Sequence, residues 1–255
     1  GPAPLVHNGR MIAEGLHGIR ATNIYNGHTL WEFPIDNILL PYHAEAQLGA
    51  AWCGSNICIS GDRLFVHDRE TCLALVMKDG KKLAELSPPS HKDGKRGLWG
   101  FIAWVDGTLF GTLVDEEHLV KSWSTKWDTS RLFTESILLF AMDAQTGEPK
   151  WSFTPEHSIR PSAIAIGDGR IYLIDRPVAP LEELRFNEDQ TRAEAKRRAA
   201  VSGRSAEEEF SLLTEHKTGR LLALDARTGE VVWENGKEIF GTNQELFFEI
   251  YFSSF

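Results

Sequence analysis

One sequence pattern, Ala-x-Asp-x-x-Thr-Gly-x-x-x-Trp, occurs twice in this chain and constrains its fold more than any other feature. The two intact copies run from Ala141 to Trp151 and from Ala223 to Trp233. A degraded copy runs from Ala21 to Trp31, and a fainter one at 74–84 ends in alanine where the tryptophan would stand. Four copies of one pattern indicate that the chain is an array of one supersecondary unit.

Each copy predicts a β-hairpin. The apolar residues that precede the aspartate alternate with others, as expected of a strand with one buried face. Asp143 and Asp225 are expected to begin tight turns by accepting hydrogen bonds from the backbone that follows them. Gly147 and Gly229 would supply the positive φ that such turns require. The unit is therefore a strand, a turn and a second strand that ends near the tryptophan.

The pattern resembles the tryptophan-docking motif of quinoprotein-like (PQQ-repeat) β-propellers. The resemblance implies that each indole wedges between adjacent blades against the turn glycine of a neighbour, because a large flat ring fills the gap between splayed sheets. The resemblance also implies which residues dock the blades on one another. They are Trp31, Trp151, Trp233, Gly27, Gly147, Gly229, Asp143 and Asp225. Asn23 and Val76 take the aspartate position in the first two copies, so blades one and two are expected to pack less regularly.

The expected architecture is an all-β propeller of four-stranded antiparallel blades. A single partial domain over residues 1–255 would hold about four blades and the start of a fifth. The blades are expected at Pro4–Phe33, Ala51–Leu86, Trp99–Phe153 and Ser162–Trp233, with the fifth beginning near Gly241. Phenylalanine or tyrosine fills five of the last nine positions, which is typical of inner strands that need cover. These features favour an incomplete propeller, a split partner, or a chain that associates through an open blade edge.

Residues 177–217 form a helical and charged insertion within blade four. Pro177 and Pro180 mark its start, alanines raise its helix propensity, and Ser202-Gly203 should divide it into two helices. Three interpretations stay open: a solvated charged excursion, a lid or partner-docking helix pair, and a phosphate or nucleic-acid contact through Arg192, Arg197 and Arg198.

Strand parity places every long connection at one end of the blades. The first and third hairpins are tight, whereas the second hairpins and the blade-to-blade links are long, so the long connections share one face, the candidate working face. Candidate binding residues at the mouth of its funnel are His43, Glu45, His157, Arg160, Asp175 and Arg176. They could bind a metal or a small anion, or they could satisfy exposed backbone and each other. We expect Asp175 to pair with Arg160 or with a nearby link.

Composition excludes several other classes. The net charge is −9 and no basic patch stands out, which argues against nucleic-acid binding. No apolar run approaches 18 residues, and no secretory leader is visible. The three cysteines are expected to be free, and no nucleotide-binding, serine-hydrolase or zinc-protease motif occurs. Resemblance alone predicts a periplasmic or other extracytoplasmic location.

Two function classes remain. The first is a non-catalytic scaffold that binds protein, peptide or glycan on the long-loop face, similar to the propeller lipoproteins of outer-membrane protein assembly. The alternative is a quinone (PQQ)-dependent alcohol or sugar dehydrogenase, or a fragment of one. Such enzymes are expected to hold PQQ with Ca²⁺, and many carry a vicinal cysteine pair. This chain has no Cys-Cys and no assignable ligand set, so we expect no cofactor.

Overall fold

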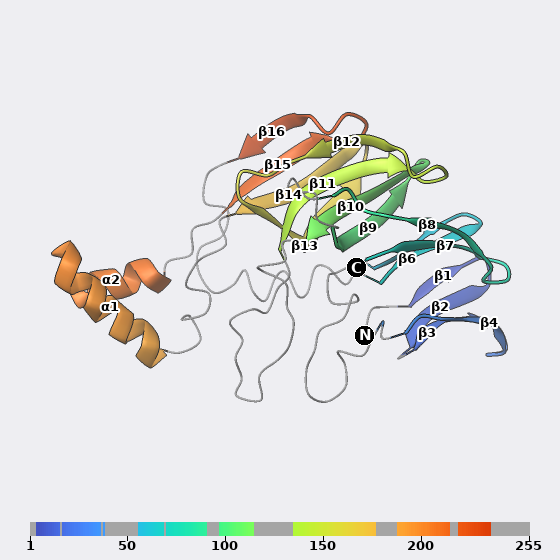
Figure 1. The fold of residues 1–255 in the computed structure, drawn as a ribbon, viewed down its shortest axis with the longest axis horizontal. Helices are drawn as coiled ribbons and strands as arrows, with labels where there is room; N and C mark the ends of the chain where they lie inside the picture. The colour runs from blue at the N-terminus through green and yellow to red at the C-terminus, as the bar shows by residue number, and fades with distance from the viewer. Residues whose placement is uncertain are drawn as a thin grey trace.

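A computed structural model of the chain describes residues 4–15, 17–36, 38, 56–68, 70–90, 97–114, 135–176, 188–214 and 219–235. The described residues form mainly antiparallel strands that fan out in successive sheets, with two helices set apart from them (Figure 1). The expected fifth blade, together with His43, Glu45 and Cys53, lies outside the described residues.

Blades one and two are separate four-stranded sheets in which consecutive strands pair antiparallel. Blade one consists of β1 (Leu5–His7), β2 (Arg10–Gly15), β3 (Gly18–Asn23) and β4 (Thr29–Pro34). Blade two consists of β5 (Ile57–Ser60), β6 (Arg63–His67), β7 (Cys72–Val76) and β8 (Lys82–Leu86). The predicted blade architecture is confirmed.

Blades three and four have the same strand order and share one short ladder. Blade three consists of β9 (Trp99–Val105), β10 (Thr108–Val114), β11 (Ser136–Asp143) and β12 (Pro149–Phe153). Blade four consists of β13 (Ser158–Gly167), β14 (Arg170–Arg176), β15 (Arg220–Asp225) and β16 (Val231–Asn235). Ser136 of β11 pairs with Ile159 of β13, which joins the two blades in one sheet.

The inner strand of blade four begins earlier than the sequence predicted. We expected a link as far as Pro161, but β13 starts at Ser158. Proline has no N–H to donate to a strand ladder, so within a strand it is tolerated mainly where the pairing is irregular, as at a bulge. The pairing with β14 shifts register between Ile159 and Ile164, and Pro161 falls within that shift.

Glycines at positive φ hold the third hairpin of every blade. Gly27, Gly80, Gly147 and Gly229 have φ between 73° and 75°, and each N–H donates to the carbonyl four residues earlier. Asp143 Oδ1 also accepts hydrogen bonds from the next backbone N–H groups, which hold the pKa of this carboxyl below its usual value. Blade two keeps the turn although Val76 replaces the aspartate, so glycine is the residue that the turn requires.

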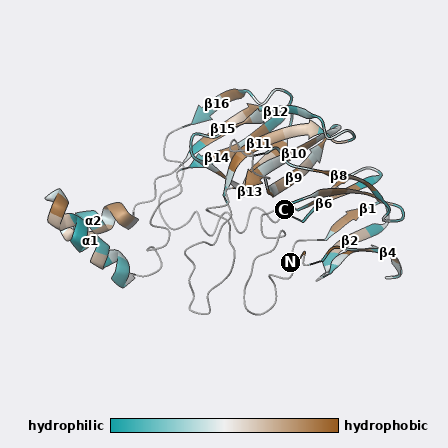
Figure 2. Ribbon diagram, viewed as in Figure 1, coloured by the Kyte–Doolittle hydropathy of each residue, from teal (hydrophilic) through white to brown (hydrophobic). Residues whose placement is uncertain are grey.

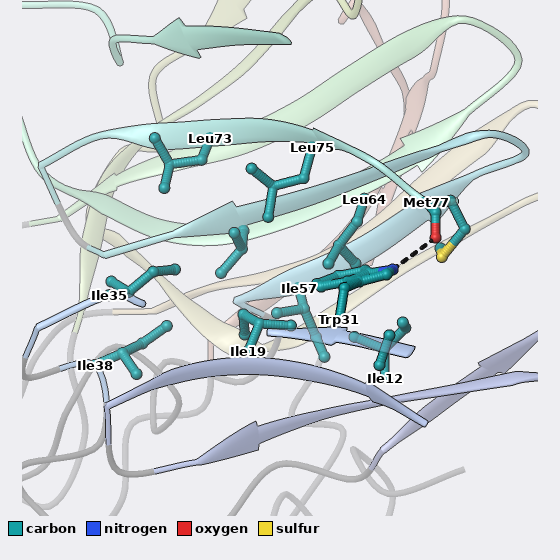
Figure 3. Packing of buried hydrophobic residues seen from close by; sticks show 12 residues of the cluster. Ile12, Ile19, Trp31, Ile35, Ile38, Ile57, Leu64, Leu73, Leu75 and Met77 are labelled. Atoms are coloured by element: carbon teal, nitrogen blue, oxygen red, sulfur yellow. Dashed lines mark hydrogen bonds between the residues drawn. The ribbon is translucent and has the colours of Figure 1, made fainter. Parts of the chain in front are cut away.

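The hydrophobic core lies between the blades. Three clusters fill the junctions between blades one and two, two and three, and three and four. In the first junction Trp31 is 8% exposed, and its Nε1 donates to the Met77 carbonyl at 3.0 Å (Figure 3). Its ring occupies the place where a Cβ on Gly80 would stand.

The junction between blades three and four repeats this arrangement. The Trp151 ring covers Gly229, and its Nε1 donates to the Ala226 carbonyl at 3.2 Å. Blade one therefore packs as regularly as blade three, and the prediction of less regular packing is wrong there, because Trp31 makes the same two contacts. Alanine replaces the tryptophan at position 84, and Leu86 contacts the turn glycine of blade three instead.

The insertion in blade four contains helices α1 (Glu188–Ser202) and α2 (Ala206–Thr214). The predicted break is confirmed, since Gly203 has φ +76° between them. Ser205 and Glu208 form a reciprocal capping box at the start of α2. The guanidinium of Arg192 lies 4.4 Å from the centre of the Phe210 ring, so a cation–π contact joins the helices. Much of α1 is hydrophilic (Figure 2).

Candidate binding site at the long-loop end of blades three and four

The candidate site lies where five strands of blades three and four reach the same edge. β10 ends opposite the start of β11, where Val114 pairs with Ser136. Ser158 at the start of β13 pairs with the end of β14, and Asp175 pairs with Arg220 at the start of β15. We call this edge, from which the long connections leave, the long-loop end.

Asp175 is the centre of the site and is fully buried. Its Oδ2 accepts a hydrogen bond from the backbone N–H of Glu156 at 2.8 Å, and its Oδ1 accepts one from the N–H of His157 at 2.9 Å. Arg220 Nη2 donates to Oδ2 at 2.9 Å. One carboxylate therefore fixes the link between blades three and four and orients the first residue of β15.

Arg220 connects the buried carboxylate with the surface. Besides Asp175, its guanidinium contacts Glu156 Oε2 at 2.8 Å and Glu234 Oε2 at 3.1 Å. The hydrogen bond to Asp175 and the neighbouring carboxylate charges raise the pKa of Arg220 above its ordinary value. Three carboxylates share one guanidinium, so the exposed part of this cluster carries a negative excess.

A second charged pair lies deeper at the same end. Arg176 Nη2 donates to Glu135 Oε1 at 3.2 Å, and both side chains are almost completely buried. The Ser158 hydroxyl donates to Glu135 Oε2 at 2.8 Å. The pair ties the residue before β11 to β13 and β14, so it fixes the relative position of blades three and four.

Comparison with known proteins identifies the family. The sequence family described as outer membrane protein assembly factor BamB matches residues 98–237, more than half of the 255-residue chain. The chain belongs to this PQQ-repeat family. The match covers blades three and four with their insertion, and therefore the whole candidate site. A comparison with curated proteins gives no match.

Solved structures share the propeller fold of this family member. Quinohemoprotein alcohol dehydrogenase from Comamonas testosteroni matches with a TM-score of 0.53 and 13% identity, covering 93% of this chain and 35% of that one. A second quinohemoprotein alcohol dehydrogenase, from Pseudomonas putida HK5, matches with a TM-score of 0.52 and 12% identity, covering 92% of this chain and 34% of that one. A computationally designed protein matches with a TM-score of 0.50 and 10% identity, covering 91% of this chain and 48% of that one. The chain thus spans about a third to a half of these structures.

The structure brings three of the six candidate residues to the site of this PQQ-repeat protein. His157, Asp175 and Arg176 lie together at the long-loop end, and the His157 side chain is exposed. The backbone of Arg160 lies in β13, but its side chain is outside the described part. We expected Asp175 to pair with Arg160 or with a nearby link. It accepts hydrogen bonds from the backbone of the link at Glu156 and His157, and its cationic partner is Arg220.

Sequence reasoning missed Arg220, Glu135 and Ser158. Arg220 follows the long insertion, 45 residues after Asp175, so the two residues are far apart in the sequence. Strand register could have revealed it, because the second hairpin of an antiparallel meander places the first residue of β15 beside the end of β14.

The buried carboxylates at this end are bonded to protein groups. Both oxygens of Asp175 and both oxygens of Glu135 already accept hydrogen bonds from protein donors. Over the described ranges, no group of three or more His, Cys, Asp or Glu side chains is placed to hold a metal ion. None of the described helices is both long and apolar enough to span a bilayer.

Proposed function

We propose that this protein is a non-catalytic propeller scaffold that binds a protein or peptide partner at the long-loop end of blades three and four. The observation that carries the proposal is the internal pairing of the buried charges at that end. Asp175 and Glu135 hold strands and links in place, and this use of the carboxylates suits a rigid recognition surface. Membership of a family described as an outer membrane protein assembly factor supports a role in protein interaction.

The surface of the site indicates the chemistry of the partner. Glu156 and Glu234 are more than half exposed, whereas Arg220, which they share, is one third exposed. Such an acidic rim favours partner segments that carry lysine or arginine, and it steers their approach. We propose an extracytoplasmic location for this activity, in keeping with the family.

Site-specific photo-crosslinking tests the proposal. A photoreactive residue at position 157 should capture one defined partner, and a residue at position 145, in the tight turn at the opposite end, should not. Glu156→Lys should then weaken binding of the purified partner, whereas Glu148→Lys at the tight-turn end should leave it unchanged. Equal capture from both positions would refute this location of the site.

The dehydrogenase alternative has its own test. The purified chain is incubated with PQQ and Ca²⁺, and reduction of an artificial electron acceptor is followed with primary alcohols and aldose sugars. We expect neither a bound chromophore nor substrate-dependent reduction. Turnover that depends on both additions would overturn the scaffold proposal.

A further inference from the structure

The described residues contain two examples of one contact between blades. Trp31 of blade one and Trp151 of blade three each cover the turn glycine of the following blade. Each indole N–H donates to the carbonyl of the residue that follows the aspartate position of that blade. The acceptor is Met77 for Trp31 (Figure 3) and Ala226 for Trp151. Trp151 also rests on Phe110 of its own blade, at 5.9 Å and 51° between the rings. These contacts define a tryptophan donor and a turn acceptor.

Blade four carries a complete donor that meets no acceptor among the described residues. Trp233 pairs with Ala223 in β15, as Trp151 pairs with Ala141 in β11. It lies on Tyr172 at 6.2 Å and 47°, close to the geometry of Trp151 on its phenylalanine. Nevertheless Trp233 is 43% exposed, and its Nε1 has no acceptor among the described residues. The ring is held in the docking position, and no described blade covers its outer face.

Blade one carries the matching acceptor, on which no tryptophan of the described part of the chain docks. Gly27 has φ +73° and its N–H donates to Asn23, as in the two occupied turns. Ile24, which corresponds to Met77, donates to the Gly9 carbonyl, as Met77 does to Asp62. No atom lies within 4 Å of a Cβ built on Gly27. Ile24 is 44% exposed, whereas Met77 is 3% exposed beneath its tryptophan.

We propose that Trp233 of one copy docks on the Gly27 turn of a second copy of this chain. The donor belongs to blade four and the acceptor to blade one, and these blades lie at opposite ends of the described row, with blades two and three between them (Figure 1). Two copies can bring them together by the contact already used at both occupied junctions. Apolar side chains exposed on both faces, Val231 and Val232 beside the donor and Tyr25 beside the acceptor, become covered.

The proposed contact joins unlike surfaces, so it is a head-to-tail interface. Such interfaces close into rings when the rotation allows it and otherwise extend into filaments. The main competing occupant of the donor is a segment of the same chain that follows β16. If that segment covered Trp233, the Gly27 turn would have no role in association, and Gly27→Val would leave association unchanged.

Sedimentation velocity of the 255-residue chain over a concentration series tests the proposal. The wild type should associate, and Trp233→Ala should raise the dissociation constant about tenfold or more, as truncation of a central tryptophan does in other interfaces. Gly27→Val should weaken association equally, since its side chain would occupy the docking place. Gly107→Val is the matched control. Gly107 also has φ +78° and open space beside it, but it lies in the first hairpin of blade three, outside the turns on which tryptophans dock.

Mixing the two variants gives the decisive measurement. The Trp233→Ala chain keeps its acceptor and the Gly27→Val chain keeps its donor, so an equimolar mixture should recover one-to-one association. Trp233→Phe, which removes the N–H and keeps most of the ring, should bind with intermediate strength and serves if the alanine variant is poorly folded by circular dichroism. A monomeric wild type, association insensitive to both variants, or failure of the mixture to complement would each overturn the proposal.

Discussion

Truncation of Trp31 measures what one inter-blade tryptophan contributes to stability. The side chain is almost completely buried against the blade two turn, and replacing such a tryptophan with alanine costs about 3–5 kcal/mol. Trp31→Phe keeps a ring in the junction and removes the donor to the Met77 carbonyl, which is itself buried. A buried acceptor left without its donor costs about 1–3 kcal/mol, so phenylalanine should lie between alanine and the wild type.

Urea unfolding followed by far-UV circular dichroism gives the free energies, and hydrogen exchange of the β3 amides shows where stability is lost. Blade one shares no strand ladder with blade two, so exchange should rise there first. Leu83→Ala is the control, because this half-exposed residue of β8 should change stability by about 0.5 kcal/mol or less. Equal losses for Trp31→Ala and Leu83→Ala would refute the wedge argument, and a wild-type value for Trp31→Phe would refute the role of the hydrogen bond.

Three further predictions concern the turn, the buried carboxylate and pH. Gly229→Ala should cost about 1–3 kcal/mol more than Gly169→Ala in urea unfolding, because both have positive φ but a Cβ at Gly229 would lie 2.5 Å from the docked indole. Asp175→Asn should lower the free energy of unfolding by about 2–3 kcal/mol, because it removes the charge that faces Arg220 and presents an amide group to backbone donors. A loss smaller than that of an exposed control substitution would contradict this. Burial raises the pKa of Glu14 to about 7, so the folded state binds this proton more tightly than the unfolded state, and stability from it is lost as pH rises from about 4.5 to 7. Glu14→Gln should therefore match the wild type near pH 4.5 and exceed it by about 3 kcal/mol at pH 8, and parallel pH profiles would disprove the assignment.

Much of the fold could be predicted from the sequence because its turns are chemically explicit. Asn8-Gly9, Asp106-Gly107 and Asp168-Gly169 place both central residues at positive φ, the geometry that two-residue hairpins prefer. These turns and the repeated glycine of the third hairpin locate the strands almost to the residue. The start of β13 was predicted too late because proline is normally a sign of a link, and only the register shift shows that the strand tolerates it.

The candidate site was predicted only in part, and the reason is again register. Strand parity correctly gathered His157, Asp175 and Arg176 at one end. The roles of Arg220 and Glu135 depend on which residues meet across strands separated by long insertions, and no tight-turn motif marks the register there. Whether polar residues at a strand end bind a ligand or each other is decided by distances of a few ångströms.

By itself the sequence determined the repeating unit, the tight turns and the face from which long connections leave, because these follow from local backbone chemistry and from the period of the strands. Only the tertiary structure decided which indole meets which turn, and that blade one and blade four end the described row with one unfilled acceptor and one exposed donor. The physical reason is that a docking contact needs two surfaces at once, and a linear motif specifies one of them at a time.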